Sequence, residues 1–276
     1  MSAAREVELT NPDRVLFPAA RFTKGDLVDY YRRVAPVLLP HLAGRPLTLG
    51  RFPAGIDGRG FATTECRGRP EWMRTAQVRL RSGEVRNHCV VDDLPSLLWV
   101  ANLGTVELHA FPIGLVIDLD PGAGTSLLDC ARVALRVREL LAAEGLEAFA
   151  KTTGSLGLHV HAALELERAA VLARSIAKQL ARDDPEGVTE SRDPAARSGR
   201  VLVDWLQSNP RVLTILPYSL RATDHPRVAA PVTWDELGAA VADEQPDALH
   251  FSPREIIYRC ERIGDPMRPV VNRRNG

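Results

Sequence analysis

The segment 115–122, with the sequence LVIDLDPG, constrains the fold more than any other part of the chain. An apolar run that ends in a Pro-Gly turn predicts a buried strand. Side chains two positions apart on a strand point to the same face, so we expect Asp118 and Asp120 side by side. Two carboxylates this close need a cation, a shared proton or strong hydrogen bonds. The segment predicts either a divalent-metal site or a turn in which Asp120 caps a helix and Asp118 is solvated.

A third acid favours the metal interpretation. The apolar segment 201–206 (VLVDWL) has Asp204 in its middle, and an isolated carboxylate in a hydrophobic strand is costly unless it is paired or binds metal. Two acids on one strand and one on another could hold two metal ions around a phosphate chain.

Composition limits the class of protein. The chain has 276 residues, 45% of them hydrophobic, which is enough for one large or two small domains with a real core. It has no apolar run of 18 residues and no secretory pattern at its start, so we expect a cytosolic protein. The formal net charge is zero, so any contact with nucleic acid must come from a local basic patch. Cys66, Cys89, Cys130 and Cys260 show no CxxC spacing, so we expect free buried thiols and no zinc site.

Hydrophobic periodicity and capping signals predict a mixed α/β chain without repeats. One helix should begin after Thr23 and end before Pro40, and another should be capped by Thr125 or Ser126 and close at Gly145. The polar segment 183–199 is expected to be a mobile loop.

A glycine-rich segment at 151–161 (KTTGSLGLHVH) leads into a further strand. Its hydroxyls and backbone N–H groups could bind phosphate, and His159 and His161 share one strand face. The alternative is a tight turn with two structural histidines. Arg221, just after a strand, could likewise hold a triphosphate or form a surface ion pair.

Together these motifs resemble the polymerase domain of bacterial ATP-dependent DNA ligase D, a branch of the archaeo-eukaryotic primase superfamily. The similarity covers almost the whole chain: 11–18, 23–27, 44–49, 102–104, 107–109, 118–120, 155–159, Asp204, 217–222 and 231–237. We find no ligase or nuclease motif, so the chain resembles a stand-alone form. The resemblance implies one domain over 1–276, with an α/β fold of the α+β type. Its catalytic core would contain mixed and antiparallel sheets flanked by helices.

The resemblance also implies roles for individual residues. Asp118, Asp120 and Asp204 would hold two Mn²⁺ or Mg²⁺ ions and act in catalysis. The DNA 5′-phosphate would bind Arg14 and Lys24, and a template base would stack on Phe61. The incoming nucleotide, an NTP or dNTP, would contact Arg51, His109, Thr153, Ser155, His159, Gln207 and Arg221.

Several positions depart from the family pattern. Leu156 and Val212 stand where the family usually has lysines near the triphosphate. A second aromatic residue beside Phe61 is replaced by Ala62, and Thr63 and Thr64 stand in place of Gln-Lys. Losing two charged hydrogen bonds, at about 1.5–3 kcal/mol each, would weaken nucleotide binding unless other groups compensate.

Three functions are compatible with this sequence. The first is a DNA-dependent nucleotidyltransferase that acts at breaks or gaps, as in non-homologous end joining. The second is a non-catalytic relative that binds DNA ends in a repair complex, which the missing lysines favour. The third is a metal-dependent phosphoesterase. The retained acids favour the first, whose partners would include Ku and a separate DNA ligase at the cytoplasmic nucleoid, with no membrane.

Overall fold

The computed structural model describes residues 5–80 and 82–272. The chain forms two compact units. Unit 1 comprises Met1–Ala110, Ile215–Val228 and Ser252–Gly264, and unit 2 comprises Phe111–Thr214, Ala229–Phe251 and Asp265–Gly276. Helices and mainly antiparallel sheets occur in both, which confirms the expected fold class. A single functional domain over 1–276 stays a prediction.

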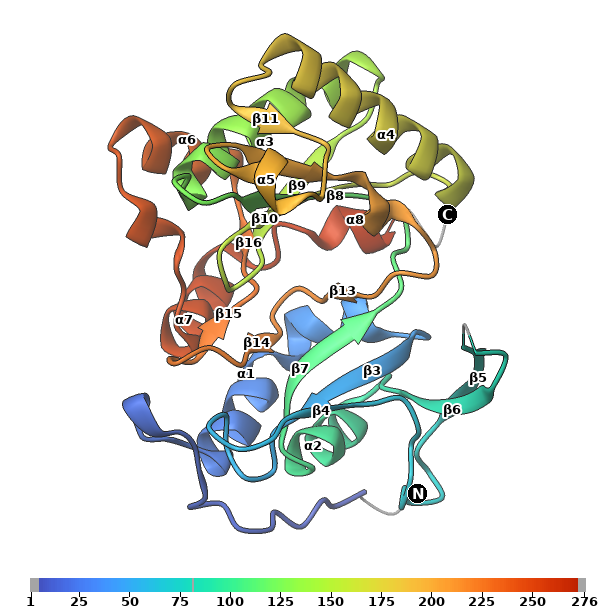
Figure 1. Cartoon of the computed structure of the whole chain (residues 1–276). Helices are drawn as coiled ribbons and strands as arrows, with labels where there is room; N and C mark the ends of the chain where they lie inside the picture. The colour runs from blue at the N-terminus through green and yellow to red at the C-terminus, as the bar shows by residue number, and fades with distance from the viewer. Residues whose placement is uncertain (1–4, 81, 273–276) are drawn as a thin grey trace. The chain divides into compact units, whose positions relative to one another are not determined.

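Unit 2 is built on a six-stranded sheet with the order β11-β12-β8-β10-β9-β16 (Figure 1). The β11–β12 pair is parallel, and the other four pairs of neighbouring strands in this sheet are antiparallel. The strands are β8 (Leu115–Pro121), β9 (Ala148–Thr152), β10 (Leu158–Ala162), β11 (Val188–Thr189), β12 (Val201–Asp204) and β16 (Pro231–Val232). The helices are α3 (Leu127–Ala143), α4 (Leu166–Asp183), α5 (Pro194–Arg197), η2 (Trp205–Ser208), α6 (Trp234–Ala242), η3 (Pro246–Leu249) and α8 (Arg268–Asn272).

The strand predicted at 115–122 is confirmed as β8, near the centre of this sheet. Leu115, Ile117 and Leu119, which share one face of the strand, are fully buried, so this face packs in the core of the unit. The following helix, α3, begins at a Ser126 capping box, and Gly145 follows its end in a left-handed conformation with φ +73°. The sequence therefore predicted this strand and helix correctly.

Unit 1 contains a second sheet with the order β13-β7-β3-β6-β5, with β4 paired to β3. The strands are β3 (Pro46–Arg51), β4 (Phe61–Thr63), β5 (Thr75–Arg79), β6 (Val85–Val90), β7 (Thr105–Ala110) and β13 (Thr214–Ile215). Unit 1 also contains two separate two-stranded sheets. One is formed by β1 (Val15–Phe17) and β2 (Phe22–Thr23), and the other by β14 (Leu220–Arg221) and β15 (Arg227–Val228). The helices are η1 (Pro18–Ala20), α1 (Lys24–Leu42), α2 (Leu94–Asn102) and α7 (Pro253–Ile263).

Helix α1 corrects one prediction. Its Thr23 capping box is present, but the helix continues through Pro36 and Pro40 to Leu42. A proline removes one helical hydrogen bond. Burial of the apolar face, including Leu38 and Leu42, offsets that cost. Tertiary packing therefore overrides the local stop signal.

The segment 183–199 also differs from the expected loop. It contains β11, which pairs with β12, and the short helix α5, which is capped by Asp193. Val188 and Thr189 are buried because they extend the sheet. Two isolated residues in a polar segment give no detectable strand period, so only the sheet reveals this element.

The expectation of free thiols is wrong for Cys66 and Cys89, which form a disulfide with a Cα–Cα distance of 5.1 Å. The Cys66 N–H donates to Asn87 O, which places the segment after β4 against β6. Cys130 and Cys260 form no disulfide within the described residues. Twenty-three positions separate the paired cysteines, a spacing that carries no recognisable pattern. No helix in residues 5–80 and 82–272 has the length and apolar character needed to span a membrane.

Candidate functional site

Three strands of unit 2 bring the predicted acidic residues together. Asp204 on β12 is paired in register with Asp118 on β8, and His159 on β10 is paired with Asp118 from the other side. Asp118 and Asp204 are both buried, with 8% and 4% of their surfaces exposed. His159 Nε2 lies 3.3 Å from Asp118 Oδ1. The sheet register thus makes Asp118 the centre of a row of three polar residues.

Asp120 adds negative charge to the same region. The pKa of Asp120 is raised to about 6, mainly by burial and then by the charges of Asp118 and Asp204, against the opposing charge of Arg197. Burial and the neighbouring negative charges therefore both disfavour the ionised form of Asp120. A cation bound here would offset that negative charge.

Asp204 has a cationic partner in this structure. The Arg192 guanidinium forms an ion pair with Asp204 Oδ2, and the Leu206 N–H donates to Asp204 Oδ1 at 3.0 Å. In the described ranges, no group of three or more His, Cys, Asp or Glu side chains is arranged to hold a metal ion. Carboxylate oxygens are nonetheless the donors that Mg²⁺ and Mn²⁺ prefer, so the donor set fits these ions. Arg192 occupies one of those donors.

The glycine-rich loop between β9 and β10 is organised by Thr153. Its hydroxyl accepts from the N–H groups of Ser155 and Gly157, at 3.3 and 3.1 Å, and lies 3.1 Å from Gly157 O. Gly157 is required by its close approach to β8, because a Cβ there would lie 2.4 Å from Leu119 O and 3.1 Å from an Asp120 carboxylate oxygen. The loop therefore lies directly against Asp120. Thr153 therefore holds the loop in shape through its hydroxyl, in addition to its predicted contact with the nucleotide.

Gln207 lies on η2, directly after β12. The hydroxyl of the adjacent Ser208 donates to Val116 O at 2.8 Å and accepts from Val116 N at 2.9 Å, which fixes η2 against β8. Gln207 Oε1 is buried and has no hydrogen-bond partner within residues 5–80 and 82–272. A buried amide oxygen without a partner is costly, so a ligand donor would satisfy it.

Unit 1 holds three of the predicted nucleotide contacts, Arg51, His109 and Arg221. Two of them contact Glu107, an acid that the sequence analysis did not assign. Glu107 Oε2 lies 2.9 Å from His109 Nε2, and Glu107 Oε1 lies 3.5 Å from Arg221 Nε. The Ala222 N–H also donates to Glu107 Oε1, at 3.0 Å. Burial alone would raise the pKa of Glu107, but the His109 hydrogen bond and the Arg221 charge hold it below its usual range. Glu107 thus orients two of the three predicted nucleotide contacts of this unit, His109 and Arg221.

Space for Glu107 is provided by its cross-strand partner. Gly50 on β3 is paired with Glu107 on β7, and a Cβ at Gly50 would lie 2.8 Å from Glu107 Cβ. The spacing of Glu107 and His109 places them on one strand face, which is the sequence signal that could have identified Glu107.

Arg14 and Lys24 line one pocket of about 210 Å³, together with Asn11, Arg51 and Asn102. Lys24 is the first residue of α1, and its Nζ donates to Thr10 Oγ1 at 2.9 Å. Burial lowers the pKa of Lys24, and the charge of Arg14 lowers it further. Two adjacent cations near a helix N-terminus form a site with affinity for anions.

Phe61 and Arg51 also meet in unit 1. The Arg51 guanidinium lies 5.3 Å from the centroid of the Phe61 ring, and Arg51 Nε donates to Leu103 O at 3.1 Å. Burial lowers the pKa of Arg51. Phe61 has 47% of its surface exposed, which leaves the ring accessible for stacking.

A comparison with protein families identifies the chain. A family model described as "LigD, primase-polymerase domain" matches residues 23–267. The chain belongs to the LigD primase-polymerase family.

Known relatives agree with this assignment. The multifunctional non-homologous end joining protein LigD of Mycolicibacterium smegmatis is 37% identical over 286 residues, which cover 98% of this chain and 37% of that protein. The corresponding DNA repair protein LigD of Mycobacterium tuberculosis H37Rv is 39% identical, over 96% of this chain and 37% of that protein. The chain therefore spans little more than a third of the length of these relatives.

A solved structure supports the same conclusion about the fold. The polymerase domain from Mycobacterium tuberculosis Ligase D in complex with DNA matches with a TM-score of 0.90 and 37% identity. The match covers 97% of this chain and 99% of that one. The primase-polymerase fold expected from the sequence is confirmed.

Leu156 and Val212, the two positions at which the resemblance leads us to expect lysines, lie in different surroundings. Leu156 is at the tip of the loop between β9 and β10, with 65% of its surface exposed, whereas Val212 is half-buried between η2 and β13. Neither side chain can donate a hydrogen bond. Arg192, which the sequence analysis did not assign, is an extra cation beside the acids of this unit. It lies in a polar segment with no recognisable motif, so no sequence signal marked it.

Proposed function

We propose that the chain is a DNA-dependent nucleotidyltransferase, a DNA/RNA polymerase or primase-polymerase that adds nucleotides at DNA breaks or gaps. The observation that carries this proposal is the register of β8, β10 and β12, which puts Asp204 and His159 on either side of Asp118 in a LigD-family chain. Buried acids on adjoining strands are costly to maintain without a role for their charge.

In this proposal, Asp118, Asp120 and Asp204 hold two Mn²⁺ or Mg²⁺ ions. When bound, such ions neutralise the triphosphate and favour deprotonation of the primer 3′-hydroxyl. His159, 3.3 Å from Asp118 Oδ1, holds that carboxylate in a fixed orientation. Arg192 releases the Asp204 carboxylate when a metal ion binds there. The Arg192 side chain is 56% exposed, which permits this movement.

Nucleotide binding divides between two sets of groups. In unit 2, His159 is paired with Asp118, Gln207 lies on η2 directly after Asp204, and Ser155 lies in the loop between β9 and β10. A nucleotide donor would satisfy Gln207 Oε1, which has no hydrogen-bond partner in the described part of the chain. In unit 1, Glu107 holds His109 and Arg221, and Arg51 carries a further positive charge. Thr153 contributes by shaping the loop between β9 and β10.

DNA contacts are assigned to unit 1. Arg14 and Lys24 bind the 5′-phosphate of a break or gap, because they line one pocket beside the N-terminus of α1, where an anion is stabilised. Phe61 stacks on a template base. We propose that the chain works in non-homologous end joining at the cytoplasmic nucleoid, with Ku and a DNA ligase as partners, since its relatives are end-joining proteins.

The decisive experiment is nucleotide addition on gapped DNA. The purified chain is given a primer, a downstream strand with a 5′-phosphate, Mn²⁺ or Mg²⁺, and each NTP and dNTP separately. We expect templated addition that requires metal and is lost in Asp118→Asn, while Glu186→Gln, an exposed acid in the same unit, retains it. Tight 5′-phosphate-dependent DNA binding without any addition would support the non-catalytic alternative instead. Hydrolysis of DNA ends without addition would support a phosphoesterase.

A further inference from the structure

Tyr31 and Ser219 place two buried hydroxyl groups beside β7, the strand of unit 1 that carries Glu107 and His109. Tyr31 lies on α1 and Ser219 lies two residues before Arg221, and both side chains are almost completely buried. Burial raises the pKa of the Tyr31 hydroxyl, so it stays protonated at neutral pH and can donate a hydrogen bond. A buried hydroxyl is costly unless it is hydrogen-bonded, so the groups that these two contact indicate their role.

Both hydroxyls bond the backbone of β7, one on each side of Glu107. The Tyr31 hydroxyl donates to Val106 O at 2.6 Å, and the Leu108 N–H donates to Ser219 Oγ at 2.8 Å. Residues two positions apart on a strand direct their backbone groups to the same edge. The two hydroxyls therefore bracket Glu107 along one edge of β7.

The same hydroxyls also bond Leu220, the residue before Arg221. The Leu220 N–H donates to the Tyr31 hydroxyl at 3.4 Å, and the Ser219 hydroxyl donates to Leu220 O at 2.9 Å. In an ordinary antiparallel ladder, the N–H and C=O groups of two strands bond each other. Here both backbone groups of Leu220 reach β7 through an inserted side-chain hydroxyl, which sets the spacing between the two segments.

The chain turns sharply just before these bridges. Leu216, which follows β13, still bonds β7 directly, because its N–H donates to Leu108 O at 3.0 Å. Tyr218 then has φ +64°, a left-handed conformation that is costly for a residue other than glycine. The Tyr30 hydroxyl donates to Tyr218 O at 2.8 Å and so helps to hold that conformation. Strained backbone of this kind clusters at functional sites, and here it leads into the segment that carries Arg221.

The spacing at Leu220 decides where Arg221 lies. Beyond Leu220, Arg221 Nε is 3.5 Å from Glu107 Oε1, and the Ala222 N–H donates to the same oxygen at 3.0 Å. His109, two positions after Glu107, lies 2.9 Å from the other carboxylate oxygen. A shift of Leu220 relative to β7 would therefore move Arg221 away from the carboxylate that it shares with His109.

We propose that Tyr31 and Ser219 are positioning residues for nucleotide binding. Their hydroxyls fix Leu220 against β7, so that Arg221 meets the triphosphate together with His109. This inference rests on the proposed function and adds to it two residues that are too deeply buried to touch the nucleotide themselves.

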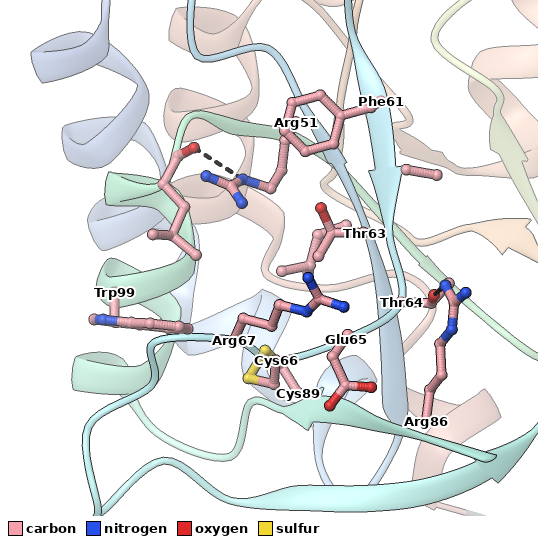
Figure 2. Close-up of a pocket in the computed structure, with 13 residues that line it drawn as sticks. Arg51, Phe61, Thr63, Thr64, Glu65, Cys66, Arg67, Arg86, Cys89 and Trp99 are labelled. Atoms are coloured by element: carbon pink, nitrogen blue, oxygen red, sulfur yellow. Dashed lines mark hydrogen bonds between the residues drawn. A yellow bond between two sulfur atoms is a disulfide. The ribbon is translucent and has the colours of Figure 1, made fainter.

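Arg51, the third predicted nucleotide contact of unit 1, is held in a different way. Its Nε donates to Leu103 O at 3.1 Å, at the C-terminal end of α2 (Figure 2). The contribution of Arg51 should therefore be independent of the two hydroxyls, which makes it an internal reference for the test.

The test measures ATP binding with Mn²⁺ by titration calorimetry, and KM and kcat for templated addition of ATP to gapped DNA. Tyr31→Phe and Ser219→Ala should each raise Kd and KM by about threefold or more, as for a lost hydrogen bond, with a smaller change in kcat. Tyr31→Phe keeps the buried ring and tests the inference even if Ser219→Ala is unstable. Ser96→Ala, which removes a buried hydroxyl from the capping box of α2, should leave both constants unchanged. Unchanged constants in Tyr31→Phe and Ser219→Ala would overturn the inference.

A double-mutant cycle separates positioning from a general loss of stability. In the Arg221→Ala background, Ser219→Ala should have little further effect on Kd, because the side chain that the hydroxyl positions is gone. In the Arg51→Ala background, Ser219→Ala should keep its full effect. Equal further losses in the two backgrounds would contradict the assignment to Arg221.

The two proposals fail in different ways. Normal nucleotide addition with unchanged constants in both hydroxyl variants would remove the positioning role alone. ATP binding that is coupled to Arg221, without any addition, would remove the proposed catalysis and support the positioning role.

Discussion

Asp204 and Asp118 face each other in register across the β12–β8 ladder, although 86 positions separate them in the chain. Opposed like charges on neighbouring strands destabilise a sheet. Arg192 reduces this repulsion at Asp204, and His159 lies beside Asp118. A divalent metal ion between the two carboxylates would reduce the repulsion further and would displace the Arg192 guanidinium from Asp204.

The first prediction concerns the acids themselves. Asp118→Asn and Asp204→Asn should each abolish metal-dependent nucleotide addition and weaken Mn²⁺ binding, because each removes an anionic oxygen donor. Mn²⁺ binding is measured by electron paramagnetic resonance, and addition by primer extension. Glu186→Gln serves as the control. Normal Mn²⁺ binding in both Asn variants would place the metal elsewhere.

A second prediction concerns Arg192. Its ion pair with Asp204 competes with a metal ion for the same carboxylate. Arg192→Ala should therefore raise the affinity for Mn²⁺ in the absence of nucleotide by at least about twofold, because it removes the ion pair of an exposed arginine with a buried carboxylate. Titration calorimetry measures the change, and Arg182→Ala, in the last turn of α4, is the control. Unchanged or weaker binding would show that Arg192 does not compete.

The third prediction tests the DNA-end pocket. Arg14→Ala with Lys24→Ala should weaken binding to 5′-phosphorylated gapped DNA more than to unphosphorylated DNA, since both cations line the phosphate pocket. The slope of log affinity against log salt should fall by about two. Fluorescence anisotropy gives both quantities, with Arg32→Ala on α1 as a control. Equal losses on the two DNAs would contradict a dedicated phosphate pocket.

Glu107 provides the fourth prediction. Glu107→Gln keeps the shape and the acceptor for the Ala222 N–H but removes the charge that holds His109 and Arg221. We expect KM for the nucleotide to rise by about fivefold or more, as for the loss of a charged hydrogen bond, with a smaller change in kcat. Glu261→Gln, which removes an exposed partner of Arg33, is the control. An unchanged KM would separate Glu107 from nucleotide binding.

The fifth prediction addresses the missing lysines. Leu156→Lys with Val212→Lys should raise kcat/KM by at least about tenfold, mainly through KM, because each adds a charged donor near the triphosphate. Leu156 is 65% exposed, so the fold should tolerate a lysine there. Val171→Lys, on an exposed position of α4, controls for added charge. No gain, with low-micromolar nucleotide binding in the unmodified chain, would show that other groups such as Arg192 already compensate.

Several features of this protein follow from local sequence alone. The strand at 115–122, the helix starts at Thr23 and Ser126, and the family itself were all predicted correctly. Short-range periodicity and capping depend on residues within a few positions of one another, so they can be read without the fold. Motif order then identifies the family. The assignment of Asp118, Asp120 and Asp204 to metal stays a prediction.

Other features depend on contacts between distant segments, which the sequence does not display. Sheet register decides that Asp204 faces Asp118, and packing carries α1 through Pro40 to Leu42. The same long-range pairing brings Cys66 to Cys89 and Arg192 to Asp204. Each of these contacts is stabilised by burial of many residues together rather than by its own local preference. For that reason only the tertiary structure decided them.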